Sequence, residues 1–329
     1  MSETLPSITV IIPTRPDGGE PLALAAARKL DYPKDKLEIL VARGKQPSVQ
    51  RNVALRAATG DLIYFLDDDS VSPPGNLRNV VEHFRDPKVQ IVGGPNLCPL
   101  DAPMLEQVFA LVLASWLAFG PSRARYTPVG KLRETGEKEL ILCNQLARRE
   151  TMLKHGGFNE ALYPNEENAL MDDIQKAGGI LLYDPELFVH RRPRRTLKAF
   201  AKMLRIYGRG RAEQFRVNPT PGSALNFVPP LFCLYLVLLP LLVWFGPKTC
   251  GPTCCAPLAL LLLAAYTVVV LLQTLALIPC GGILRSAGAL PLIVLTHIFY
   301  GLGFWHGLFT DLKKPPAQKA DAVTIEKIQ

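Results

Sequence analysis

Three consecutive carboxylates, Asp67, Asp68 and Asp69, directly follow the apolar run Leu62–Leu66. A buried parallel strand is typically a continuous apolar run, and ligands of an open α/β sheet bind beyond the carboxyl ends of its strands. Adjacent acids repel one another unless a cation lies among them, and a hard divalent ion takes carboxylate oxygens together with substrate phosphates. The pattern therefore indicates a metal and phosphate site, with a polar loop that caps the next helix as the alternative.

A second pair of acids, Glu166 and Glu167, follows Asn165. Asn165 is expected to cap a helix, because Leu170 and Ile174 have helical spacing. Acids in the first turn are stabilised by the positive end of the helix, which by itself explains both glutamates. Opposite a metal-holding strand end, however, such a carboxylate can take a proton from an attacking hydroxyl. A general base is therefore the second explanation.

Ten Lys or Arg residues and one acid lie between Arg191 and Arg216. A basic amphipathic helix among anionic lipid headgroups has this composition, and a solvated charged face is the alternative. The cluster that precedes it, Arg191 to Arg195, can grip phosphates with paired N–H donors. The cations expected on one helical face are Lys198, Lys202, Arg205 and Arg209.

These groups need a scaffold, and the first two thirds of the chain predict one. Short β-branched runs such as Ser7–Ile12 and Leu37–Ala42 alternate with helical segments such as Ser48–Ala58. This alternation predicts an α/β domain with a doubly wound, mainly parallel sheet. The domain is expected to cover residues 1–222, with a basic interfacial helix at its end.

The rest of the chain is strongly apolar and predicts a transmembrane helical region. Three stretches, Leu225–Phe245, Ala256–Pro279 and Ala287–Phe309, each approach the ~20 residues that a spanning helix needs. The N-terminus lacks a signal-peptide pattern, so residues 1–222 are expected on the cytoplasmic side. About three helices are expected at 223–311 and a polar tail at 312–329. Three crossings put the tail outside, whereas Lys313 and Lys314 favour the inside. Either one apolar segment is re-entrant, with the first favoured by Pro229, Pro230 and Pro240, or the large basic domain outweighs the positive-inside tendency.

A shorter apolar segment, Glu106–Gly120, precedes the acidic pair in the sequence. It is too short to span a bilayer, so it is expected either in the membrane surface or in a buried core. Its Trp116, together with the four cations of the basic helix, is a candidate contact for a lipid acceptor.

These landmarks, in this order, resemble family 2 glycosyltransferases with the GT-A fold, and especially membrane-attached enzymes of the succinoglycan-glucosyltransferase type. The resemblance covers nearly the whole chain. It is carried by Val10–Thr14, Gln50–Asn52, Phe65–Asp69, Arg148–Arg149, Gly156–Glu160, Asn165–Glu167, Tyr183–Pro185, Pro193–Arg194, Tyr207–Gly208 and Tyr300–Gly307.

The resemblance implies roles for the two acidic groups. Asp67 matches the acid that usually faces the nucleoside, and Asp69 the acid that holds a divalent metal, Mg²⁺ or Mn²⁺, on the donor diphosphate. His190 matches the place of a third metal or phosphate contact. Glu167 matches the general base and Glu166 the acid beside it. The donor-binding residues implied or inferred are Pro13, Thr14, Arg51, Asn52, Asp67, Asp68, Arg191, Arg194 and Arg195.

The resemblance further implies a metal-dependent, inverting transfer of a sugar from a nucleotide-sugar donor. A membrane-tethered enzyme suggests a lipid-linked saccharide of the polyprenyl type as acceptor, in surface polysaccharide or glycoconjugate synthesis at the inner (cytoplasmic) membrane. The expected enzyme is multi-pass and binds no nucleic acid. Absence of the Gln-x-x-Arg-Trp motif of processive synthases favours addition of one sugar at a time.

Two rival functions remain open at this stage. One is a polyprenyl-phosphate glycosyl synthase, in which the lipid phosphate itself attacks. The other is a catalytically silent membrane assembly protein, suggested by two departures from the family pattern. The segment Ala42–Gln46 lacks the acids that usually recognise the nucleotide base, and Glu167 stands where an aspartate is usual.

Overall fold

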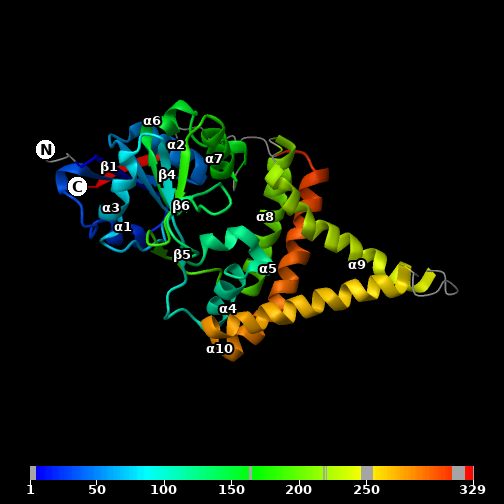
Figure 1. The fold of residues 1–329 in the computed structure, drawn as a ribbon. Coiled ribbons are helices and arrows are strands. Elements are labelled where there is room, and N and C mark those ends of the chain that lie inside the picture. Colours follow the sequence, from blue (N-terminus) through cyan, green and yellow to red (C-terminus); the bar gives the residue numbers. More distant parts are fainter. Residues whose placement is uncertain are drawn as a thin grey trace. The chain divides into compact units, whose positions relative to one another are not determined.

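The computed structural model describes residues 5–162, 165–217, 219, 221–245, 255–312 and 323–328. The chain forms two compact units, each made of segments that are distant in the sequence (Figure 1). The first unit comprises Met1–Leu100, Pro121–Arg192 and Lys313–Gln329, and the second comprises Asp101–Gly120 and Pro193–Leu312.

An eight-stranded sheet organises the described part of the first unit, in the order β10-β2-β1-β3-β7-β4-β8-β6. The predicted apolar strands form one side of it. β1 (Ile8–Thr14) pairs in parallel with both β2 (Leu37–Arg43) and β3 (Leu62–Leu66). Every residue of β1 and β3 is buried, as expected for strands that are covered on both faces.

The sheet is mixed, whereas the sequence predicts mainly parallel pairing. β7 (Asn144–Arg148) runs antiparallel between β3 and β4 (Val89–Gly93). Beyond β4 lie β8 (Ile180–Tyr183), which is parallel to it, and β6 (Arg133–Glu134), which is antiparallel to β8. A separate pair of short parallel strands, β5 (Asn96–Leu97) and β9 (Val189–His190), lies outside this sheet.

Helices cover both faces of the sheet, as a doubly wound α/β unit requires. Residues of α1 (Leu22–Ala27) and α3 (Asn76–Val80) belong to the hydrophobic core on one face. Residues of α2 (Pro47–Ala57), α6 (Arg149–Lys154) and α7 (Glu166–Lys176) belong to the core on the other. Short 3-10 helices complete the unit at Lys34–Lys36, Val81–Arg85, Gly120–Arg125 and Glu160–Leu162.

The segment expected as a polar tail ends in a strand, β10 (Thr324–Ile328), which pairs antiparallel with β2. Two ion pairs join these strands: Arg43 Nε to Glu326 Oε1 at 2.5 Å and Lys327 Nζ to Glu38 Oε1 at 2.7 Å. After its apolar helices the chain therefore returns to the sheet. Lys313 and Lys314 lie outside the described residues.

The second unit is helical. It contains α4 (Met104–Leu113), α5 (Trp116–Phe119), α8 (Leu197–Val217), the 3-10 helix Pro221–Phe227, α9 (Val228–Phe245) and α10 (Cys255–Phe309). Two of its helices are long and apolar enough to cross a membrane, which indicates membrane association. α10 joins two of the three predicted stretches, with a break at Gly282, where φ is 72°. Its two halves run in different directions (Figure 1).

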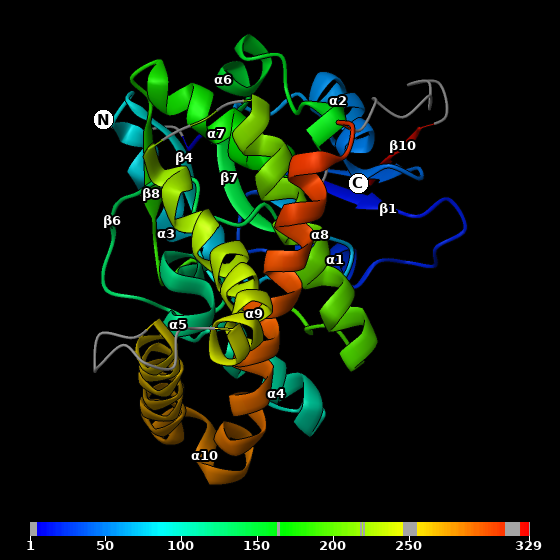
Figure 2. The same ribbon diagram turned by 90° about the vertical axis from the view of Figure 1, so that its right-hand side faces the viewer.

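α8 and the C-terminal half of α10, residues 283–309, lie side by side (Figures 1 and 2). A Cβ atom at Gly208 would lie 2.0 Å from the carbonyl oxygen of Tyr300, and one at Gly303 would lie 2.1 Å from that of Arg205. Glycine is needed at both positions because the two backbones touch. The Tyr207–Gly208 and Tyr300–Gly307 motifs are thus the two sides of one helix contact.

The apolar segment Glu106–Gly120 packs inside the second unit. The ring of Phe109 on α4 stacks on Phe200 of α8, with centroids 4.3 Å apart. α4 and the helical segment that begins with α5 are bent by 62° at their break. Two side chains of α10 bind the backbone of Leu117 just after this break: its N–H donates to Gln273 Oε1 at 3.1 Å, and its carbonyl accepts from His297 Nε2 at 2.9 Å.

Candidate functional site

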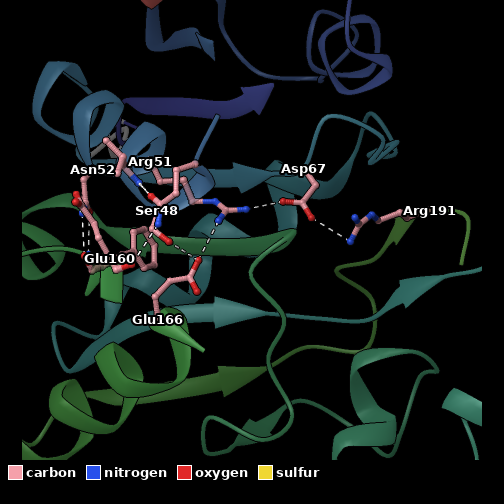
Figure 3. Close-up of polar contacts among 10 residues, drawn as sticks. Ser48, Arg51, Asn52, Asp67, Glu160, Glu166 and Arg191 are labelled. Atoms are coloured by element: carbon pink, nitrogen blue, oxygen red, sulfur yellow. Dashed lines mark hydrogen bonds and ion pairs between the residues drawn. The ribbon is translucent and has the colours of Figure 1, made fainter. Parts of the chain in front are cut away.

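Two arginines, Arg51 and Arg191, pair with Asp67, the first acid after β3 (Figure 3). Asp67 Oδ1 accepts a hydrogen bond from Arg51 Nη2 at 2.7 Å, and Asp67 Oδ2 lies 3.0 Å from Arg191 Nη1. Arg191 Nε also donates to Asp69 Oδ1 at 2.5 Å. Arg191 therefore bridges the first and third acids, in the position that the sequence assigns to a cation.

Backbone pairing fixes the place of Arg191. The N–H of His190 donates to the carbonyl of Val71 at 2.9 Å, and the N–H of Val71 donates back to His190 at 2.8 Å. The N–H of Arg191 donates to the carbonyl of Leu97 at 2.9 Å. The end of β9 is thereby tied to the loop that follows the three acids, which brings a residue 122 positions away onto Asp69.

The local charges alter the pKa values of this cluster. Burial raises the pKa of Asp68, and the neighbouring charges of Asp69 and Asp67 raise it further. Burial alone lowers the pKa of Arg191, but the surrounding negative groups, Asp67 first, raise it well above its ordinary value. Arg191 is therefore a permanent cation on carboxylates that repel one another.

The donor set at the end of β3 fits a divalent ion by its chemistry, because Asp67 and Asp69 supply hard carboxylate oxygens. Arg191 occupies oxygens of both, so a metal ion and this guanidinium would compete for them. Within the described ranges, no three His, Cys, Asp or Glu side chains form a metal-binding group, so His190 does not join the two acids. Its Nδ1 is buried without a hydrogen-bond partner, and its ring lies edge-on to Phe188.

The acidic pair at the start of α7 is linked to the same cluster through Arg51. Glu166 Oε1 accepts from Ser48 Oγ at 2.9 Å and lies 3.4 Å from Arg51 Nη1 (Figure 3). Arg51 thus connects Glu166 with Asp67. Asn165 lies at the N-cap position but makes no side-chain capping bond; its Oδ1 accepts from Asn168 Nδ2 at 3.0 Å instead.

Burial makes both glutamates weaker acids than usual. It raises the pKa of Glu166, which the positive charge of Arg51 partly offsets. It raises the pKa of Glu167 to about 7, with a further contribution from the charge of Glu166 and an opposing one from Arg125. A carboxylate with a pKa near 7 is suited to accept a proton at neutral pH.

The remaining donor candidates on the first unit have structural contacts. Pro13 and Thr14 are buried at the end of β1, where the carbonyl of Thr14 accepts from Gln50 Nε2 at 2.7 Å. Asn52 is turned towards the loop before α7: its Nδ2 donates to Phe158 O at 2.8 Å and to Glu160 Oε1 at 2.9 Å. The amide of Asn52 therefore holds the Gly156–Glu160 motif in place and does not join the acids.

Asn52 also explains one glycine of that motif. Gly157 has a φ of 75°, and a Cβ atom there would lie 2.5 Å from Asn52 Oδ1. The N–H of Phe158 donates to the same oxygen at 2.8 Å. The motifs that contain Asn52 and Gly157 therefore contact each other in the fold, although they are about 100 residues apart in the sequence.

The loop after β2 has a partner that the sequence did not predict. Arg43 Nη1 donates to the carbonyl of Gly18 at 2.7 Å, while Arg43 Nε binds Glu326 of β10. The acid beside this loop thus comes from the far end of the chain. Through Gly18, the same arginine also binds the loop that follows Thr14 at the end of β1.

Arg194, Arg195 and the lipid-contact candidates belong to the second unit. Trp116 of α5 is 58% exposed. Arg209 is half-buried, and its Nε donates to the buried Glu213 at 2.7 Å. The second unit's cations that are exposed on and before α8 are Arg194, Arg195, Lys198, Lys202, Arg205 and Arg216.

Comparison with known proteins gives two family matches. Residues 17–102 match the model described as glycosyl transferase family 2. Residues 62–283, more than half of the chain, match the model described as glycosyl transferase family group 2.

Curated relatives and solved structures agree with these matches. The pre-mycofactocin glycosyltransferases of two Mycobacterium tuberculosis strains, CDC 1551 / Oshkosh and H37Rv, are each 29% identical over 164 residues, which is 50% of this chain. The chain spans only 34% of the length of these relatives. A similar fold occurs in the mannosyltransferase PcManGT from Pyrobaculum calidifontis, solved with GDP-Man and Mn²⁺. Its TM-score is 0.53 at 20% identity, and the match covers 93% of this chain and 88% of the other.

The raised pKa of Glu167 predicts a pH-dependent stability. Its pKa is about 7 in the folded chain against an ordinary value of 4.5, so the folded state binds more protons between these values. The contribution of Glu167 to the free energy of unfolding is therefore present below pH 4.5 and is lost as the pH rises through 7. Glu167→Gln cannot ionise, so we expect it to be more stable than the parent at pH 8, by on the order of 1–3 kcal/mol.

Denaturant unfolding at pH 5, 6, 7 and 8 measures this difference. Glu150→Gln is the matched control, because Glu150 is exposed on α6. The control should follow the parent at every pH. A Glu167→Gln variant that does the same would show that Glu167 titrates normally.

Proposed function

Because the chain belongs to glycosyl transferase family 2, we propose that its first unit transfers a sugar from a nucleotide-sugar donor to a lipid-linked saccharide, with inversion and with a divalent ion. Membership of this family makes the protein a transferase. The α/β unit has a GT-A-like fold, and the match to PcManGT covers 93% of the chain. One observation carries the proposal: two of the three acids at a strand end pair with two arginines, beside two buried glutamates of raised pKa.

The acids and arginines fit the donor diphosphate. Departure of a nucleoside diphosphate develops negative charge that must be neutralised. Asp67 and Asp69 would hold Mg²⁺ or Mn²⁺, which when bound neutralises and orients the phosphates. Arg191 would exchange its two carboxylates for phosphate oxygens, which its planar fork of donors suits. PcManGT, of similar fold, was solved with GDP-Man and Mn²⁺, and this supports a nucleotide sugar and a metal as ligands here.

The acidic pair fits the acceptor side of the reaction. An acceptor hydroxyl must lose its proton as it attacks the sugar, and a base with a pKa near the working pH is the most effective. Glu167 has that pKa, about 7. Glu166, held by Ser48 and Arg51, keeps a second negative charge beside it and links the base to the donor acids. We therefore assign deprotonation to Glu167 and positioning to Glu166.

A lipid-linked acceptor is favoured by the second unit. Its apolar helices indicate membrane association, and the exposed Lys198, Lys202 and Arg205 of α8 offer charges to an anionic lipid head. A polyprenyl-diphosphate-linked saccharide has both an apolar tail and such a head. Nucleotide sugars are made in the cytoplasm, so the proposed location is the inner face of the cytoplasmic membrane.

The coupling between Arg191 and the acids makes a prediction about metal binding. In Arg191→Gln the carboxylates lose their internal cation, so Mn²⁺ alone should bind roughly tenfold more tightly than in the parent. A nucleoside diphosphate with Mn²⁺ should bind more weakly, because Arg191 no longer meets the phosphates. Titration of free Mn²⁺ by electron paramagnetic resonance, with and without UDP or GDP, gives both constants.

The control for charge alone is Arg56→Gln, because Arg56 is exposed near the end of α2. This variant should bind metal and nucleotide as the parent does. If Arg191→Gln also leaves Mn²⁺ affinity unchanged, Arg191 and the ion do not share carboxylates.

Replacement of the proposed base distinguishes the acceptor classes. Glu167→Gln should lower turnover by ~100-fold or more while donor affinity is retained, because a hydroxyl acceptor needs a base. Radiolabelled transfer from UDP- and GDP-sugars to polyprenyl-diphosphate saccharides measures turnover, with Glu150→Gln as the control. If Glu167→Gln transfers sugar to polyprenyl phosphate at the rate of the parent protein, the enzyme is instead a polyprenyl-phosphate glycosyl synthase, since a phosphate needs no deprotonation. Absence of transfer and of donor hydrolysis in the parent protein would favour the silent assembly protein.

A further inference from the structure

We propose that the chain crosses the bilayer twice, through α9 and the N-terminal half of α10, and that the C-terminal half of α10 lies with α8 in the headgroup layer. The partner of this α8–α10 surface is an anionic lipid surface. The proposal does not depend on the reaction that the first unit catalyses.

The first argument is the return of the chain to the sheet. The chain leaves the first unit after Arg192 and re-enters it with β10, which pairs with β2 along residues 324–328. A strand can pair only with a neighbour on its own side of the membrane. The number of crossings between Arg192 and β10 must therefore be even, which excludes the three crossings that the sequence predicts.

Three apolar helical segments compete for these crossings. They are α9 and the two halves of α10, residues 255–281 and 283–309, which are separated by the break at Gly282. A φ of 72° at that glycine ends the first half and lets the chain change direction. An even number of crossings thus leaves one of the three segments out of the hydrocarbon.

The contacts of α8 identify that segment as the C-terminal half of α10. The two helices cross in close contact: Gly208 meets the backbone of Tyr300, Gly303 that of Arg205, and Gly307 that of Arg209. Arg216 extends the contact, since its Nη1 donates to the carbonyls of Gly307 at 3.1 Å and Thr310 at 2.5 Å.

α8 cannot lie in the hydrocarbon, since charged side chains at the bilayer centre are costly. The C-terminal half of α10 touches the backbone of α8 at residues 205 to 209 and accepts hydrogen bonds from the Arg216 side chain, so we place it at the same polar depth. The charged residues of α8 are Lys198, Lys202, Arg205, Arg209, Arg211, Glu213 and Arg216.

The two halves of α10 also differ in how many large apolar side chains they expose. Large apolar side chains are exposed all along its first half, as lipid contact requires, and at few positions in its second half. The exposed set in the first half is Leu258, Leu260, Leu261, Leu262, Val268, Val269, Leu271, Leu272 and Leu275. In the second half it is Ile283, Leu284, Leu302 and Phe309.

The resulting surface has the composition of an interfacial layer. Exposed cations of α8, Lys198, Lys202 and Arg205, suit anionic headgroups, and the exposed Phe309 and Trp116 suit the boundary with the acyl chains. With two crossings the chain returns to the side on which it left the sheet. This agrees with the positive-inside tendency, which three crossings contradict.

The crossing number is tested with protease sites in the full-length chain, one inserted after Gly251 and one appended after Gln329. In bacterial spheroplasts, added protease should cut only the site after Gly251. In inverted membrane vesicles it should cut only the site after Gln329. Cleavage after Gln329 in spheroplasts, or cleavage at both sites only in inverted vesicles, would overturn the proposal.

The depth of the two halves of α10 is tested with a matched pair of substitutions. Leu262 is 56% exposed in the first half and Leu302 is 46% exposed in the second. Leu262→Lys should lower the yield of folded protein in membranes several-fold, whereas Leu302→Lys should leave it near the parent value. An equal loss in both variants would place the second half in the hydrocarbon and contradict the proposal, and so would no loss in either.

Discussion

A chain of ion pairs between two acidic groups is the interaction on which this structure depends. It runs from Glu166 through Arg51 to Asp67, and from Asp67 through Arg191 to Asp69. Without the two guanidinium groups, carboxylates from β3 and α7 would face one another with uncompensated charge, which is costly when partly buried. The arginines come from the helix after β2 and from the end of β9. Four segments that are distant in the sequence are therefore fixed by one electrostatic requirement.

The same requirement prepares the site for a substrate. Arg191 binds two carboxylates that a divalent ion would also choose, and its own preferred alternative is a phosphate. When a metal ion and a diphosphate bind, the metal would take the carboxylates and Arg191 would take the phosphate oxygens, so none of these charges would be left unpaired. Glu167 lies outside the ion-pair chain, and its raised pKa follows from burial and from the charge of Glu166. Under the proposed function, the donor and acceptor roles therefore fall on different carboxylates.

The sequence predicted the features that depend on local composition. The strands β1 and β3 are largely apolar runs, β2 is apolar between Glu38 and Arg43, and the acids that follow β3 are where the pattern placed them. It missed β7, because this strand begins with the polar Asn144 and Gln145. Both are buried: Asn144 Oδ1 accepts from Tyr64 at 2.9 Å, and its Nδ2 donates to Leu187 O at 2.7 Å. Local sequence does not reveal that a polar side chain will find hydrogen-bond partners in distant parts of the chain.

The remaining differences are also tertiary. Residues 324–328 lie in the expected polar tail but form a strand, because they pair with the edge of β2 and pack Ile325 and Ile328 against the two cores. Asn52 belongs to a family motif, but its side-chain amide donates hydrogen bonds to Phe158 O and Glu160 Oε1. The bridge from Arg191 to the acids joins residues too far apart for spacing to predict. The apolar periodicity of the sequence predicts where the apolar helices lie. It does not predict the backbone conformation of Gly282 or the contact between α8 and the C-terminal half of α10.

The central claim is that Asp67 and Asp69, through a divalent ion, bind the diphosphate of a nucleotide sugar. It is tested most directly by the affinity of UDP and GDP for the parent protein and for Asp69→Asn, measured by calorimetry in Mn²⁺ and in EDTA. We predict that Mn²⁺ strengthens binding of the preferred nucleotide to the parent by roughly tenfold or more, and that Asp69→Asn loses this dependence. Equal strengthening by Mn²⁺ in both proteins would contradict the account.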